Sequence, residues 1–293
     1  MAERTEKQSN KKRWFCCVFA VMLFAVCAVA AYPIYVGNKT LETHEYKIES
    51  ELLPVAFDGY KIAQVSDLHN AEFGQGNKNL LSELAKTAAD VILLTGDLID
   101  SRKTNVEKAL QFVEKAVEIA PTYYVTGNHE ERIPETYNLL KTGLIGFGVT
   151  VLENEGVWLE KEGARIRLIG LKDPACVGSW NAEQEGYVRT QLNAFVWGEE
   201  YTVLLSHRPE LFDLYAERGV DLVFSGHAHG GQFRLPKMGG LFAPDQGFFP
   251  KYDAGLYEKG RTKMLVSRGL GNSLFPFRVN NNPEIVVAVL CKK

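Results

Sequence analysis

Residues 91–100 read VILLTGDLID, a run of apolar and β-branched residues that ends in Gly96, Asp97 and Asp100. Short β-branched runs bounded by glycine or aspartate are typical of buried strands. In open α/β sheets, ligand sites form outside the carboxyl ends of the strands. The stretch therefore predicts a strand over residues 91–95 that presents Asp97 at the edge of a sheet.

The same pattern recurs along the chain, with helical patterns between the runs. Further strands are expected at 60–65, 122–126, 202–205 and 221–225, each ending in Asp, Asn or His residues. Amphipathic spacing predicts helices over 79–88, 106–119 and 209–218, the last with Pro209 in its first turn. Alternating residues predict short strands between 149 and 171 and two more near the C-terminus, at 263–267 and 284–290. The body is therefore predicted to be mixed α/β, with some strands antiparallel.

Five of the six histidines follow these strand ends: His69, His129, His207, His227 and His229. His44 stands apart and is expected to be a surface or linker residue. Imidazole and carboxylate donors without thiolate favour Mn, Fe or Zn over a structural zinc knot. Two such ions that share a carboxylate lower the pKa of a bridging water and neutralise phosphoester charge.

The order of the motifs carries a resemblance. D-x-H at 67–69, G-D-x-x-D at 96–100, G-N-H-E at 127–130, His207, and G-H-x-H at 226–229 follow one another. This series resembles that of the calcineurin-like metallophosphoesterases and covers about residues 58–290. The resemblance implies an α/β fold with a central β-sandwich of mixed sheets flanked by helices. It also implies two divalent metal ions, Mn, Fe or Zn, with Mn favoured.

The resemblance assigns roles residue by residue. The first ion would be held by Asp67, His69 and His229, the second by Asn128, His207 and His227, and both by Asp97. His129 would face the substrate, as a general acid or a phosphate-orienting group. Asp100 and Glu130 would orient His129 or a ligand, and Arg268 would approach phosphate, with plain structural roles left open for all three.

The N-terminal segment is apolar and has no charged side chain from residue 14 to residue 38. About 20 such residues span a bilayer as a helix. Residues 1–13 are expected to form a basic cytoplasmic tail, 14–36 a transmembrane signal anchor, 37–57 a linker and first strand, and 58–293 the phosphoesterase domain. The excess of Lys and Arg before the anchor predicts a single-pass cell-membrane protein with its catalytic domain outside. A signal peptide cleaved near Ala28-Val29-Ala30, giving a secreted protein, and a core helix are the alternatives.

Further stretches are similar to the membrane-anchored branch of that family. They are IGLKDP at 169–174, GHAHGGQF at 226–233, APDQGFFPKYDAGLY at 243–257 and SRGLGN at 267–272. The resemblance implies hydrolysis of a phosphodiester or pyrophosphate by a metal-bridging hydroxide. Some members resemble hydrolases of UDP-diacylglucosamine, so a lipid-linked or nucleotide-diphosphate substrate is one expectation, although cytoplasmic lipid assembly conflicts with an external domain. Phosphomonoesterase activity and a non-catalytic metal-binding module are the alternatives. A non-catalytic module would be expected to lack one or more of the motif residues.

The remaining features narrow the function. A net charge of −3 gives no overall attraction to nucleic acid, and no nucleic acid or obligate protein partner is expected. Cys176 and Cys291 lie in the body and are expected to be free thiols, with pairing left open. The aromatic segment 239–260 is predicted to be a long loop, either a wall over the metals or packing against the sheet.

Overall fold

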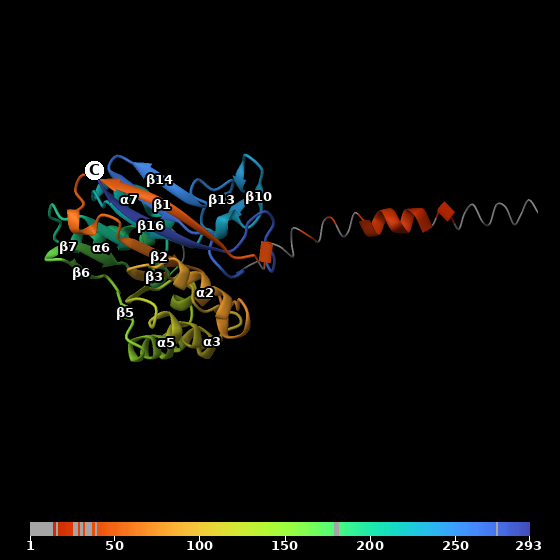
Figure 1. Ribbon diagram of the computed structural model, residues 1–293, viewed down its shortest axis with the longest axis horizontal. Coiled ribbons are helices and arrows are strands. Elements are labelled where there is room, and N and C mark those ends of the chain that lie inside the picture. The colour runs from red at the N-terminus through yellow and green to blue at the C-terminus, as the bar shows by residue number, and fades with distance from the viewer. Residues whose placement is uncertain are drawn as a thin grey trace, which may run out of the picture.

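A computed structural model describes residues 14–15, 17–25, 29, 32, 37–38, 40–178, 182–273 and 275–293. Two six-stranded sheets stack to form a sandwich, and helices lie against the outer face of each (Figure 1). Both sheets contain parallel and antiparallel pairs. The predicted mixed α/β class, with mixed sheets flanked by helices, is confirmed.

The first sheet joins both ends of the described body. In spatial order its strands are β1 (Glu42–Ser50), β16 (Glu284–Lys292), β2 (Lys61–Val65), β3 (Val91–Thr95), β4 (Thr122–Val125) and β5 (Thr150–Val151). β16 runs parallel to β1 and antiparallel to β2, and it pairs with both. The expected linker therefore leads into a full strand of the sheet.

The second sheet has the spatial order β14 (Gly255–Lys259), β15 (Thr262–Val266), β9 (Leu222–Ser225), β8 (Thr202–Leu205), β7 (Ala164–Gly170) and β6 (Glu155–Lys161). Two small sheets stand beside it. One consists of β10 (Arg234–Leu235) and β11 (Gly239–Gly240), the other of β12 (Phe242–Ala243) and β13 (Gly247–Phe248).

The helices divide between the two outer faces. Packed on the first sheet are α2 (Lys78–Lys86), α3 (Val106–Ala116) and α5 (Pro134–Gly146), and on the second α6 (Ala182–Ala194) and α7 (Phe212–Glu217). The short α4 (Asn128–Glu131) follows β4 directly. The predicted helix at 209–218 is divided, because Pro209–Leu211 forms a 3-10 turn before α7 begins.

Alternation along the strands explains why both faces of each sheet are apolar. In β3, Val91 and Leu93 point into the core between the sheets, whereas Ile92 and Leu94 pack under the helices. All four are buried, and each such side chain contributes about 1.5–3 kcal/mol by leaving water. A strand covered on both faces reads as a continuous apolar run, which is what residues 91–95 show.

The predicted tail at 1–13 lies outside the described residues, and the predicted anchor at 14–36 lies partly outside them. Across the part of the chain that the structure describes, no helix combines the length and the apolar character needed to cross a bilayer. Cys176 and Cys291 are free thiols, as expected.

His44 lies within β1, where its Nδ1 is 2.6 Å from Oε2 of the buried Glu284. This hydrogen bond raises the pKa of His44 above its ordinary value. A raised pKa in the folded state means that the stabilisation is complete below about pH 6.5 and is lost as the pH rises through the folded pKa.

We therefore expect wild type to be more stable than His44→Gln at low pH, by no more than about 1 kcal/mol because the pair is partly exposed. The difference should shrink as the pH rises. Urea unfolding of both proteins across this window measures it. A difference that grew with pH would contradict this assignment.

Candidate metal centre

The polar residues that follow β2, β3, β4, β8 and β9 meet at one end of the sandwich. β2, β3 and β4 are mutually parallel, as are β8 and β9, so the loops that leave each set share an edge. The two sets are joined directly, since Nδ1 of His207 lies 2.7 Å from the carbonyl oxygen of Thr95. That carbonyl accepts the Nδ1 proton and turns Nε2 of His207 toward Asp97.

A first group of donors surrounds Asp67. The ligand atoms of Asp67, His69, Asp97 and His229 all lie within 4.8 Å of one another, and all four residues are buried. Nε2 of His69 is 3.2 Å from Nε2 of His229. Oδ1 of Asp67 is 3.4 Å from Nε2 of His229. Two imidazoles and two carboxylates converging in this way can hold a divalent ion.

A second group shares Asp97 with the first. It consists of Asp97, His207 and His227, whose ligand atoms again lie within 4.8 Å of one another. Oδ2 of Asp97 is 3.3 Å from Nε2 of His207 and 3.5 Å from Nε2 of His69, which belongs to the first group. One carboxylate oxygen therefore faces both groups, as a bridging ligand must.

Asn128 completes the second group. Its amide oxygen faces Nδ1 of His227 at 2.8 Å, so two hydrogen-bond acceptors point at each other unless the amide is turned over. A cation between the two atoms removes this repulsion, and a turned amide would donate to His227 instead. With its oxygen toward His227, Asn128 can coordinate a metal ion, whereas in the turned amide that oxygen would accept hydrogen bonds from Arg132.

The electrostatics of the cluster also fit a cation. Burial lowers the pKa of His69 to about 3, and burial also lowers that of His229, so both imidazoles keep lone pairs for coordination. Burial opposes protonation of His207 too, but the Asp97 carboxylate raises its pKa to about 10. A proton on His207 thus balances Asp97 in the metal-free cluster. A divalent ion would take over that role, because buried carboxylates need a positive partner.

Five of the seven predicted ligands have left-handed backbone conformations. The φ angles are 52° at Asp67, 44° at His69, 52° at Asp97, 66° at His227 and 48° at His229. Such angles are uncommon outside glycine and cost of order 1–3 kcal/mol each. They turn each side chain sharply inward as its strand ends. Backbone strain of this kind clusters at functional sites.

Two glycines are required by close approach to the carboxylates. A Cβ atom on Gly127 would lie 2.3 Å from Oδ1 of Asp97, and one on Gly226 would lie 2.4 Å from Oδ2 of Asp67. Neither distance leaves room for a methyl group. The glycines of the G-N-H and G-H-x-H motifs therefore make space for the ligands of neighbouring motifs.

Glu130 holds the backbone around Asp97. Its buried carboxylate accepts hydrogen bonds from the N–H groups of Asp97 at 2.9 Å, Ile99 at 3.1 Å and Gly127 at 2.8 Å. Burial, followed by repulsion from Asp97, raises the pKa of Glu130 to about 8. Its contacts fix the loop that presents the shared carboxylate.

His129 lies beside the cluster with one nitrogen occupied. Its Nδ1 accepts a hydrogen bond from the backbone N–H of Ser101 at 3.0 Å, so the proton of the neutral ring is on Nε2. Nε2 in turn lies 3.2 Å from Oγ of Ser273. Burial lowers the pKa of His129, which favours this neutral form. The ring thus offers an N–H donor.

Asp100 lies beside His69 and His129, whereas Arg268 lies away from the cluster. Oδ2 of Asp100 is 3.8 Å from Nδ1 of His69, and Oδ1 is 3.9 Å from Nδ1 of His129. The carboxylate also pairs with the side chain of Arg102 at 3.1 Å. Arg268 is not brought into the cluster. Its guanidinium pairs with Glu42 at 3.2 Å and Glu284 at 3.6 Å.

Arg208, next to the predicted ligand His207, forms a buried network of ion pairs. Its Nε and Nη2 atoms contact Asp173 at 2.7 and 3.0 Å, and its Nη1 contacts Asp245. Nη1 also lies 3.5 Å from Oε1 of Glu210. Glu210, His227 and Asp245 converge like metal ligands, but the guanidinium already supplies a positive charge among them.

A cavity of about 240 Å³ opens onto the cluster. Arg102 and Arg132 line it together with Ser273 and Pro244, beside the metal-binding side chains. Sequence reasoning did not select either arginine. Arg132 could be selected from the sequence, because it lies three residues after His129 and so shares a face of the short helix.

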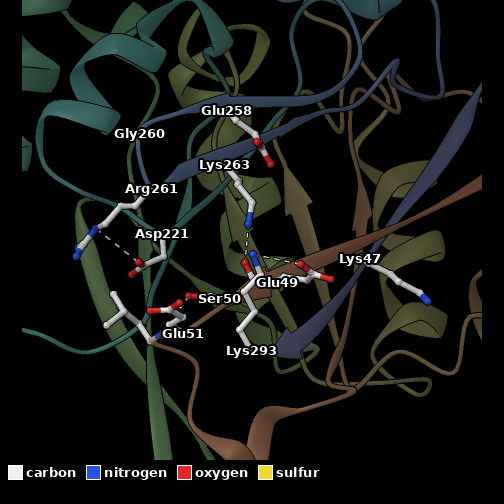
Figure 2. Close-up of a pocket in the computed structure, with 11 residues that line it drawn as sticks. Lys47, Glu49, Ser50, Glu51, Asp221, Glu258, Gly260, Arg261, Lys263 and Lys293 are labelled. Carbon is white, nitrogen blue, oxygen red and sulfur yellow. Dashed lines mark hydrogen bonds and ion pairs between the residues drawn. The ribbon is translucent and has the colours of Figure 1, made fainter.

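A larger cavity of about 520 Å³ lies elsewhere, lined by the end of β1, the β14–β15 turn and Lys293 (Figure 2). β1 runs opposite to β2, so this cavity is at the edge of the sheet away from Asp67. Its charges pair with one another, Arg261 with Asp221 at 3.7 Å and Lys293 with Glu49 at 3.3 Å. The smaller cavity, which opens onto the metal-binding side chains, is therefore the candidate active site.

Comparison with known proteins agrees with this geometry. The model of the calcineurin-like phosphoesterase family matches residues 60–231, which include every residue of the two donor groups. The chain belongs to the calcineurin-like phosphoesterase family. This calcineurin-like phosphoesterase is therefore a metal-dependent phosphoester hydrolase, and the predicted enzyme class is confirmed. The family uses two divalent ions, and the two buried groups suit such a pair.

The relatives of this calcineurin-like phosphoesterase span most of its length. The metallophosphoesterase YkuE of Bacillus subtilis is 31% identical over 264 residues, covering 88% of each chain. The phosphodiesterase YaeI of Escherichia coli is 28% identical, covering 79% of this chain and 82% of YaeI. A transmembrane protein with metallophosphoesterase domain from Bos taurus is 29% identical, covering 92% of this chain and 61% of that protein.

Proposed function

We propose that this enzyme hydrolyses a phosphodiester or pyrophosphate bond at a centre of two divalent ions bridged by Asp97. The observation that supports this most strongly is the single oxygen Oδ2, which faces His69 and His207 from opposite donor groups. The proposed ligands are Asp67, His69, Asp97 and His229 for one ion, and Asp97, Asn128, His207 and His227 for the other.

The protein's own groups have separate tasks around these ions. When bound, the ions would supply Lewis acidity and positive charge at the phosphoryl group, with Mn²⁺ the favoured metal. His129 would donate its Nε2 proton in a hydrogen bond to a substrate oxygen, so that negative charge developing there is stabilised. Arg102 and Arg132 would attract the anionic substrate into the cavity.

An apolar or lipid-linked substrate is the finer part of this proposal. Pro244 forms part of the cavity wall. In the same loop, Phe248 is 72% exposed and Phe249 is 56% exposed. Exposed aromatic side chains beside a site suit an apolar substrate group. The relative YaeI is a phosphodiesterase, which supports a diester over a monoester. Phosphomonoesterase activity is the competing candidate, because both ester types carry the phosphoryl group that the centre binds.

The location of the enzyme is also a proposal. We propose an N-terminal anchor over residues 14–36 with the tail at 1–13 inside the cell and the phosphoesterase domain, 58–293, outside. The charge-free apolar sequence supports an anchor, and the basic tail supports its orientation. An intact mass measured on protein from native membranes would match residues 1–293, whereas loss of about 30 residues would indicate a cleaved signal peptide.

An ester panel tests the reaction. The purified full chain with Mn²⁺ is expected to hydrolyse an aryl phosphodiester at least roughly tenfold faster than the matching monoester, a difference of about 1.4 kcal/mol in activation free energy. A lipid-linked pyrophosphate is assayed in parallel, with chelator-treated protein as the blank. A tenfold preference for the monoester would favour the competing candidate.

A further inference from the structure

Asp245 lies in the turn between β12 and β13, in the predicted aromatic loop, and reaches back to the metal centre. Its Oδ2 is 2.8 Å from Nε2 of His227. The side chain is partly buried and has a left-handed backbone conformation with φ of 58°. The contact joins a surface loop to a proposed ligand of the second ion.

The two ring nitrogens of His227 face different groups. Nδ1 points at the amide oxygen of Asn128, 2.8 Å away, inside the second donor group. Nε2 points at the carboxylate of Asp245. Nη1 of Arg208 also lies 3.1 Å from Nε2, but it already donates to Oδ2 of Asp245. We therefore place the proton of His227 on Nε2, where it donates to the same carboxylate oxygen. Nδ1 then keeps the lone pair that a metal ion requires.

Asp245 is itself held in position by buried groups. Nη1 of Arg208 bonds to the same Oδ2 atom that accepts from His227, and the rest of the guanidinium is fixed by two bonds to Asp173. Arg208 is only 2% exposed. The carboxylate is therefore oriented by the fold before any metal arrives.

The loop that carries Asp245 is closed on itself. The side-chain amide of Gln246 donates to the carbonyl of Tyr252 at 2.8 Å and accepts from its N–H at 2.9 Å. Lys251, next to this closure, is exposed. If the loop opened, Asp245 would leave His227, and the imidazole would lose the partner that fixes its tautomer.

We propose that Asp245 is a positioning residue for the second metal ion, and that docking of loop 241–253 and binding of that ion stabilise each other. The proposal rests on the two-metal centre described above. Coupling of this kind is reciprocal, so the metal must hold the loop closed as strongly as the loop favours the metal. Substrate entry past the loop is thereby linked to the metal content of the site.

Metal titration of the full chain tests the first half of the proposal. Asp245→Ala is expected to weaken binding of one Mn²⁺ ion by about 10–100-fold and to leave the other unchanged. Asp245→Asn, which keeps an acceptor without the charge, should fall between Ala and wild type. Asp213→Asn is the matched control, because Asp213 pairs with Lys259 on the surface, 2.9 Å away. The unchanged affinity for one ion shows that the fold is intact.

Limited trypsin digestion tests the second half. Mn²⁺ is expected to slow cleavage after Lys251 in wild type and in Asp213→Asn, and to protect Asp245→Ala much less at the same concentration. Equal protection and equal Mn²⁺ affinities in all these proteins would overturn the proposal. Wild type that bound no pair of ions would instead overturn the two-metal centre, and the coupling with it.

Discussion

Asp97→Asn is expected to lower kcat by at least roughly 10²–10³-fold, the loss typical of removing one preorganised electrostatic group. Oδ1 of Asp97 accepts the N–H of His129 at 2.8 Å, so an asparagine would keep its oxygen there. Its NH₂ group would then replace Oδ2 and face His69 and His207 with hydrogen atoms. The bridge would be lost at the point where both ions need a negative oxygen.

Initial rates on an aryl phosphodiester with saturating Mn²⁺ measure this effect. Asp213→Asn serves as the matched control for removal of a carboxylate charge, because its side chain is surface-exposed. Turnover by Asp97→Asn at the wild-type rate would show that Asp97 does not bridge the ions.

The second large effect is expected at His129. His129→Gln should lower kcat by about 10²–10⁴-fold, the usual contribution of a positioned proton donor. The amount of bound Mn²⁺ should stay the same, because Nδ1 of His129 is occupied by Ser101 and Nε2 points toward Ser273. A defect in kcat without a defect in metal content separates His129 from the ligands.

Metal analysis and steady-state kinetics on the same preparation of His129→Gln make this distinction. If bound Mn²⁺ fell together with kcat, His129 would be a ligand. If neither changed, the ring would have no role in the reaction.

Local patterns were enough to predict the strands that carry the site. The runs before Asp67, Asp97 and Asn128 are short, apolar and ended by polar residues, and each forms a strand where expected. Left-handed residues follow the strands at Asp67 and Asp97, whereas Asn128 begins the short helix α4. Both features depend on neighbouring residues, so the sequence contains them directly.

Helices with weak local signals were missed. α5 contains Gly143 and Gly146, which disfavour a helix, yet it forms because Tyr137, Leu140 and Leu144 pack against the first sheet. α6 is similar, since it contains Gly186 yet packs Val188 and Leu192 against the second sheet. In both cases tertiary packing outweighs intrinsic propensity.

The contacts around the ligands depend on residues far apart in the chain. Asp100 lies beside His69 and His129, but the hydrogen bond to Nδ1 of His129 comes from the backbone N–H of the adjacent Ser101. The link from Asp245 to His227 requires a loop to fold back over the G-H-x-H motif. The periodicity of the sequence does not predict such contacts, because they depend on how the two sheets are stacked.

Anomalous diffraction from crystals of the Mn²⁺-loaded full chain tests the central claim most directly. Two manganese peaks are expected about 3.5–4 Å apart, with Oδ2 of Asp97 between them. One peak should lie near Asp67 and His229, the other near Asn128 and His227. A single peak, or two peaks that do not share Asp97, would contradict it.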